Sequence, residues 1–171
     1  MGTLSTRKPR VILTGVMAAA CLLPTAELAL ATTTTSTFTV SITLTATCTI
    51  NSASALNFGS VGLLTSNTPG TSTIQVTCSN TTPYNIGLDA GTSSGATVTT
   101  RKMTSSGNTV SYALYSDSAR TTNWGNTVGT DTVSGTGNGT GQNYTVYGQV
   151  PSQTTPAPGA YTDTITVTVT Y

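Results

Sequence analysis

The sequence predicts an all-β fold, and specifically an antiparallel β-sandwich of immunoglobulin type. Every periodic segment alternates apolar and polar residues with the two-residue period of a strand, and none has the period of an amphipathic helix. About six to eight such segments follow one another with turn residues between them, which is the spacing of a sandwich. The many threonines fit this fold, because a β-branched hydroxyl residue packs well on a half-solvated strand.

The first residues predict a secretory signal peptide over residues 1–31. Three basic residues precede an apolar run from Val11 to Leu23, and Ala29-Leu30-Ala31 supplies a cleavage site of small residues. The apolar run is too short to span a bilayer, so we expect no transmembrane segment. Cys21 lies inside the run, and a lipidated cysteine there is the alternative to cleavage after Ala31.

A strictly alternating segment follows the signal peptide almost directly. Its apolar side chains share one face of the expected strand, and they are Phe38, Val40, Ile42, Leu44 and Ala46. The other face carries hydroxyl groups. We expect residues 32–45 to form an N-terminal strand distinct from a domain at residues 46–171.

The following segments supply the body of the sandwich in chain order. They are 48–50, the short apolar run 56–59, 73–78, 84–88, 96–103 at a sheet edge, 110–115, and 142–150 before Pro151. Turn residues separate them at 79–83, 89–91, 117–125 and 156–159. The Gly- and Thr-rich stretch 129–141 is expected to be a long hairpin or loop.

The last segment, 163–171, alternates as strongly as the first. Its apolar side chains are Ile165, Val167, Val169 and Tyr171, and no downstream segment is expected to pair with it. The sandwich then lacks its last strand and exposes apolar residues with unpaired N–H and C=O groups. A neighbour's opening strand would fill this edge and bury four apolar side chains, each worth roughly 1.5 to 3 kcal/mol. Repeated head to tail, such a contact builds a filament.

Two cysteines, Cys48 and Cys78, remain after the signal peptide is removed. In an exported chain we expect them to form one disulfide, which would contribute about 3 to 4 kcal/mol by restricting the unfolded chain. Two free buried thiols are the alternative. A zinc site is not expected, because the mature chain has no histidine and no further cysteine.

The composition argues against catalysis and against several kinds of partner. The chain has no histidine, and the expected mature part has no glutamate and a net charge of −1, so nucleic acid and anionic membranes are poor partners. We expect no cofactor and no enzymatic activity. Lys102 is interpreted as an edge charge that discourages wrong strand pairing. Asp117 and Arg120 either fix their own loop or bind a ligand, and Trp124 belongs either to the core or to a sugar-stacking platform.

Several segments in this order resemble the spore coat U domain proteins, which include the pilins of archaic chaperone-usher pili such as the Csu type. Besides the alternating strand before Cys48, the matching segments are Leu56-Asn57-Phe58-Gly59, Val76-Thr77-Cys78, the run 112–120 and the run 159–169. The segment 128–142 does not align with this pattern, so its pairing is not predicted.

The resemblance implies an incomplete immunoglobulin-like β-sandwich that a donor strand from another chain completes. It also implies a periplasmic chaperone that lends a strand temporarily, an outer-membrane usher, and exchange for the next subunit's N-terminal strand. Mapped onto this chain, the donor face is Phe38, Val40, Ile42 and Leu44, and the acceptor edge is Ile165, Val167, Val169 and Tyr171. Cys48 and Cys78 match the family disulfide.

The sequence therefore predicts a structural pilin subunit of a surface fimbria that acts in adhesion and biofilm formation. The alternative is a secreted, self-complemented β-sandwich that binds carbohydrate or coats a surface. Only residues 45–47 separate the opening strand from Cys48, which favours donation to another molecule over folding back.

Overall fold

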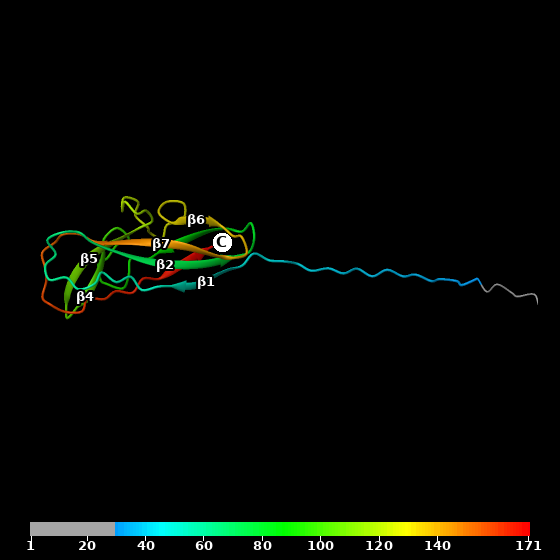
Figure 1. The fold of residues 1–171 in the computed structure, drawn as a ribbon, viewed down its shortest axis with the longest axis horizontal. Coiled ribbons are helices and arrows are strands. Elements are labelled where there is room, and N and C mark those ends of the chain that lie inside the picture. The colour runs from blue at the N-terminus through cyan, green and yellow to red at the C-terminus, as the bar shows by residue number, and fades with distance from the viewer. Residues whose placement is uncertain (1–29) are drawn as a thin grey trace, which may run out of the picture. The chain divides into compact units, whose positions relative to one another are not determined.

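The computed structural model describes residues 30–171, and its regular structure there consists of antiparallel strands (Figure 1). Residues 42–171 form one compact unit, and the preceding residues belong to a separate unit. The expected signal peptide lies almost entirely outside the described residues, so its boundary stays a prediction.

Within residues 30–171, eight strands are arranged in two sheets. The larger sheet has the order β1 (Cys48–Ala53), β2 (Thr68–Cys78), β7 (Gly141–Val150), β5 (Asn108–Tyr115) and β4 (Arg101–Ser105). The smaller sheet has the order β6 (Val133–Thr136), β3 (Pro83–Leu88) and β8 (Val167–Thr170). All pairings within them are antiparallel, and the prediction of an all-β antiparallel fold is confirmed.

The centre of the domain is the long pairing of β2 with β7, which lie side by side in Figure 1. The register runs without interruption from Thr68 opposite Val150 to Thr77 opposite Gly141. On β2 the side chains of Ile74, Val76 and Cys78 are buried, as the two-residue alternation predicts.

The core lies between the two sheets. Its buried hydrophobic members include Ile74, Val76, Tyr84, Ile86, Leu88, Leu114, Trp124, Val146 and Val150. Trp124 is one of these core residues, and its indole nitrogen donates a hydrogen bond to the carbonyl oxygen of Ile86 at 2.8 Å. Its polar atom is thereby satisfied without solvent.

The structure adds detail to two stretches whose conformation the sequence left open. The apolar run 56–59 is not a strand, and Leu56 and Phe58 instead pack over glycines of the large sheet. A Cβ atom added at Gly148 would lie 2.7 Å from a methyl group of Leu56. Within the Gly- and Thr-rich stretch, Val133–Thr136 pairs with β3 as an outer strand.

The edge strand expected over 96–103 begins later, as β4 at Arg101. The residues before it form turns, in which the Thr97 and Thr100 backbones bond to each other. Arg101 itself is fully buried, although it stands next to Lys102 in the sequence. Burial of this charged side chain is possible because its guanidinium donates hydrogen bonds to four main-chain carbonyl oxygens, those of Leu88, Asp89, Val98 and Trp124.

Candidate functional site

Strand β8 has a neighbour on one side only within the described part of the chain. It pairs with β3, with Asn85 opposite Thr170 and Gly87 opposite Thr168. From Tyr161 to Val169 the side chains alternate between half-buried and exposed, so the extended geometry begins before the hydrogen-bonded strand does. Strand β8 is therefore an edge of the small sheet.

The backbone of this segment turns hydrogen-bonding groups toward the open side. The N–H of Asp89 donates to the carbonyl oxygen of Thr166 at 3.2 Å, and the N–H of Thr166 donates to the Asp89 carboxylate at 2.9 Å. In an antiparallel strand, successive residues point their backbone groups to opposite sides. The groups of Ile165, Val167 and Val169 therefore face away from β3.

The pairing on β3 agrees with this geometry. The N–H of Leu88, which lies opposite Val167, donates to the carbonyl oxygen of Gly125 at 2.8 Å and not to β8. Leu88 and Val167 are thus a pair without mutual hydrogen bonds. The unpaired row of β8 is available to a further strand.

An apolar groove lies between this edge and the end of β1. One part has a volume of about 540 Å³ and is bounded by residues 53–58 and 161–165 with Val167. Core side chains form its floor, and they are Ile74, Leu88, Leu114 and Val146. A strand laid along the groove would cover these side chains and extend the small sheet.

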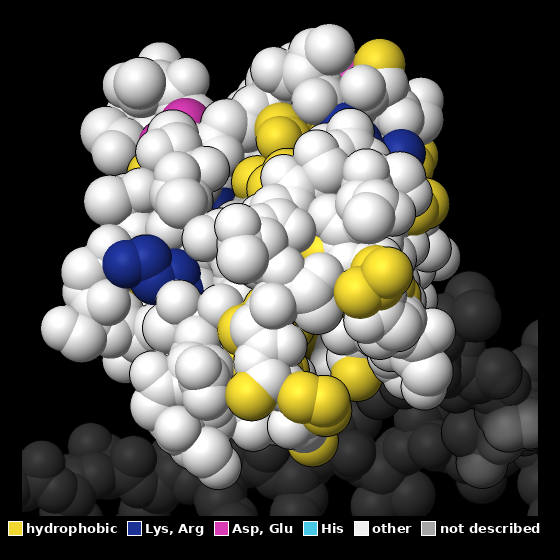
Figure 2. Space-filling view, turned by 90° about the vertical axis from the view of Figure 1, so that its left-hand side faces the viewer, with side chains coloured by type: hydrophobic (Ala, Val, Ile, Leu, Met, Phe, Trp, Pro, Cys, Tyr) yellow, Lys and Arg dark blue, Asp and Glu magenta, His cyan; other side chains and the backbone are white. Residues whose placement is uncertain are grey.

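A second part of about 660 Å³ continues the groove past Leu56, Phe58 and Tyr161, which line both parts. It is bounded by the loop 59–62 and by residues 155–160. The loops before β2 and before β8 lie at the left of Figure 1, and Figure 2 views that end. Hydrophobic side chains there form patches on a surface that carries few charges (Figure 2).

One charged side chain interrupts the inward row of the segment 161–169. Asp163 accepts a hydrogen bond from the Tyr112 hydroxyl at 2.8 Å, and its other oxygen accepts from the Thr92 backbone N–H at 2.9 Å and the Thr92 hydroxyl at 3.0 Å. Burial, together with the hydrogen bond to Asp163, raises the pKa of Tyr112 far above its ordinary value. Tyr112 stays neutral and keeps its proton directed at the carboxylate.

The predicted donor residues are almost fully exposed. Phe38, Val40, Ile42 and Leu44 have exposed fractions of 87%, 82%, 84% and 86%, and residues 30–47 are not assigned to a strand. A segment counts as a strand only when it is hydrogen-bonded to a partner strand, and the single chain offers residues 30–47 no such partner. Their role as a donor strand therefore stays a prediction. Of the predicted acceptor residues, Ile165, Val167 and Val169 are half-buried and Tyr171 is 60% exposed.

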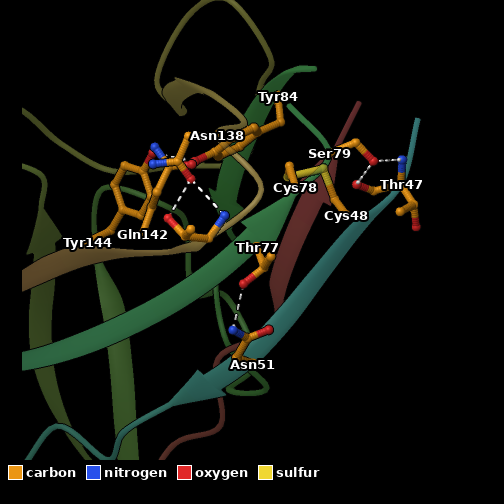
Figure 3. The surroundings of a disulfide bond; sticks show 11 residues. Thr47, Cys48, Asn51, Thr77, Cys78, Ser79, Tyr84, Asn138, Gln142 and Tyr144 are labelled. Carbon is orange, nitrogen blue, oxygen red and sulfur yellow. Dashed lines mark hydrogen bonds between the residues drawn. A yellow bond between two sulfur atoms is a disulfide. The ribbon is translucent and has the colours of Figure 1, made fainter. Parts of the chain in front are cut away.

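The disulfide joins the starting point of β1 to the end of β2 (Figure 3). Cys48 and Cys78 are bonded at 2.03 Å, and the predicted disulfide is confirmed. Beyond it, the N–H of Ser79 donates to the carbonyl oxygen of Thr47 at 2.9 Å, and the N–H of Thr47 donates to the Ser79 hydroxyl at 3.0 Å. The chain preceding Cys48 is therefore anchored at Thr47.

The loop that contains Asp117 and Arg120 is held by its own contacts. The Asp117 carboxylate accepts from the backbone N–H groups of Thr121 and Thr122, and Arg120 donates to the carbonyl oxygen of Gly148 at 3.0 Å. The same guanidinium lies 5.9 Å from the centre of the Tyr147 ring. These contacts give both charged side chains a structural role.

Two parts of the groove were not predicted from the sequence: the Tyr112–Asp163 pair and the position of Leu56 and Phe58. The burial of Arg101 in the core was not predicted either. Asp163 was visible as the one acid in the alternating segment, but Tyr112 is separated from it by 51 residues. Such a long-range contact has no local signal.

No cluster of at least three metal-ligating side chains occurs among the residues that the structure describes. Over the same range, no helix is long and apolar enough to cross a membrane.

The fold and the groove define an immunoglobulin-like β-sandwich domain with an apolar groove along the open edge of β8. The chain belongs to the Spore Coat Protein U domain family, whose model matches residues 34–168. None of the curated protein sequences matches it.

Among solved structures, it is similar to a chain in the CsuC–CsuE chaperone-tip adhesion subunit pre-assembly complex from archaic chaperone-usher Csu pili of Acinetobacter baumannii. The two chains are 29% identical with a TM-score of 0.55, and the match covers 75% of this chain and 40% of the other. This chain thus corresponds to less than half of that chain's length.

Proposed function

We propose that this chain is a structural subunit of an archaic chaperone-usher fimbria that polymerises by donor-strand complementation. One combination of features carries the proposal: the same chain has an apolar groove along the open edge of β8 and an exposed alternating segment, 38–46. The segment has the period and the apolar face that the groove requires.

The energy of such a contact is sufficient for a durable polymer. Phe38, Val40, Ile42 and Leu44 would together contribute about 6 to 12 kcal/mol on burial, before the cost of ordering the segment is subtracted. The backbone N–H and C=O groups of Ile165, Val167 and Val169 face away from β3. Hydrogen bonds to these groups would add specificity for an extended strand. The contact joins the N-terminal segment of one molecule to the β8 edge of another. Because such a head-to-tail contact does not close into a ring, its repetition produces a filament.

The partners follow from the same mechanism. An exposed apolar groove with an open strand edge aggregates unless it is covered, which supports a periplasmic chaperone that occupies the groove before assembly. The similar Csu chain was solved in a chaperone–subunit complex, in agreement with this role. We further propose delivery through an outer-membrane usher to the cell surface, where the fimbria would function in adhesion and biofilm formation. The role is structural and not enzymatic.

The test compares the mature chain 32–171 with a form that lacks residues 32–44, each with and without a peptide spanning residues 35–45. Size-exclusion chromatography measures assembly, and circular dichroism measures unfolding. We expect polymers from the mature chain and a labile monomer from the shortened form, which the peptide stabilises. A stable monomeric mature chain that unfolds only on truncation would overturn the proposal and indicate self-complementation.

A further inference from the structure

The groove also contains a feature that selects one register for the incoming strand, an inference that rests on the proposed function. A strand with two-residue alternation can slip by two residues and still keep its apolar side chains inward. An apolar groove that is uniform along its length would therefore tolerate several registers. This groove is not uniform, because Asp163 stands in its inward row.

The Asp163 carboxylate is fixed in place. It is engaged by Tyr112 and Thr92, and a Cβ atom added at Gly91 would collide with it. A bulky apolar side chain placed against it would desolvate a carboxylate without adding a donor, which is unfavourable. The apolar part of the acceptor row therefore begins only at Ile165.

The donor row has a matching change in size. Phe38, Val40, Ile42 and Leu44 are large, and the next inward residue is Ala46. Every strand pairing in the two sheets is antiparallel, so we place the donor antiparallel to β8. Ala46 is then the one residue of the donor row small enough to lie beside Asp163.

We propose that Asp163 fixes the donor register by stopping the large apolar residues of the incoming strand at Leu44, with Ala46 beside the carboxylate. The row that results pairs Leu44 with Ile165, Ile42 with Val167, Val40 with Val169 and Phe38 with Tyr171. All four large donor residues then meet the four predicted acceptor residues.

The two neighbouring registers are each disfavoured. A slip in one direction places Leu44 against Asp163. A slip in the other direction brings Cys48 opposite Asp163, yet Cys48 is bonded to Cys78 in β1 of its own domain, and Thr47 is held by Ser79.

The test uses cysteine pairs on the outward faces, where substitution leaves the groove intact. In the proposed register Thr43 lies opposite Thr166, as an antiparallel pair without mutual hydrogen bonds, with Cα atoms about 4.5 Å apart. That distance suits a disulfide. Three double variants are compared under mild oxidation: T43C/T166C, T43C/T164C and T43C/T168C. All four positions are exposed, so the three variants are closely matched.

We expect covalent ladders on non-reducing gels from T43C/T166C, at least tenfold more abundant than from either shifted pair. Predominant ladders from T43C/T164C or T43C/T168C would overturn the register while leaving donor-strand assembly intact. If neither the three variants nor the unmodified chain form polymers, the proposed function is overturned as well.

A second comparison separates the role in register from a role in folding. Replacing Asp163 by Val in the three double variants removes the polar group that Leu44 would have to desolvate. We expect the ladders to spread to T43C/T164C, whereas D163N, which keeps an acceptor for Tyr112, retains the original preference. Unchanged cross-linking in polymers of the D163V series would overturn the assignment of Asp163.

Discussion

The guanidinium of Arg101 donates through Nη2 to the carbonyl oxygen of Trp124 at 2.7 Å, in the buried interior of the domain. The same nitrogen donates to the carbonyl oxygen of Leu88 at 2.9 Å. One side chain of edge strand β4 thus ties the end of β3 to the loop that carries Trp124. Since β3 is also the partner of β8, this contact supports the sheet to which edge strand β8 belongs.

Replacing Arg101 by Met is expected to lower the free energy of unfolding by about 3 to 5 kcal/mol, because several main-chain carbonyl groups lose their donor in a buried site. Urea denaturation of the form that lacks residues 32–44, with the peptide 35–45 bound, measures this loss of stability. The matched control is Lys102→Met in the next position, for which we expect a change within about 0.5 kcal/mol. Equal effects at the two positions would contradict the assigned role of Arg101.

Acid is expected to weaken the attachment of the segment before β8. Burial acts to raise the pKa of Asp89, but hydrogen bonds from Thr166 and Gly91 outweigh it and lower the pKa below the ordinary value of 3.8. A depressed carboxyl pKa stabilises the fold above the unfolded pKa, and this contribution is lost as the pH falls through the folded pKa.

Urea midpoints measured from neutral pH down to about pH 2.5 test this linkage. We expect the urea concentration at the midpoint to decrease once the pH drops below about 4. The decrease should be less steep in Asp89→Asn, whose amide oxygen still accepts a hydrogen bond but does not titrate. An identical acid slope in that variant would show that Asp89 does not contribute.

The glycine at position 148 is expected to be required because Leu56 rests on it. In Gly148→Ala the new Cβ atom would approach Leu56 to 2.7 Å and displace the wall of the groove. We expect a loss of about 1 to 3 kcal/mol, measured by thermal unfolding of the peptide-bound domain. Gly62→Ala is the control, since a Cβ atom there meets no atom within 4 Å. A tolerated Gly148→Ala would contradict this packing.

The strands that the sequence predicted well are those with strong alternation. Ile74 and Val76 of β2 are buried as expected, because one face of a pleated strand must be covered. The run 56–59 was recognised as a short apolar run, yet Leu56 and Phe58 pack over Gly70 and Gly148, which no local pattern reveals.

The site was predictable in its edges and not in its interior. Val167 and Val169 could be placed on the last strand from their alternation, and that strand is an edge of the small sheet. Its role as the acceptor of a donor strand stays a prediction. Arg101 could not be recognised as buried, because a charge beside Lys102 on an edge strand resembles a solvated one, and the carbonyl groups that hold it come from separate segments. The contact of Tyr112 with Asp163 is likewise set by tertiary structure alone.

If the apolar face of the segment 38–46 joins molecules, the same charge placed on its two faces must have opposite effects on assembly. Ile42→Asp puts a carboxylate on the apolar face, and Thr43→Asp puts it on the hydroxyl face one residue later. Size-exclusion chromatography of the mature chains measures polymer formation, and stabilisation of Ile42→Asp by the unmodified peptide 35–45 shows that its groove is intact. We expect that Ile42→Asp remains monomeric while Thr43→Asp polymerises. Polymers from Ile42→Asp, or equal loss of assembly in both variants, would contradict this expectation.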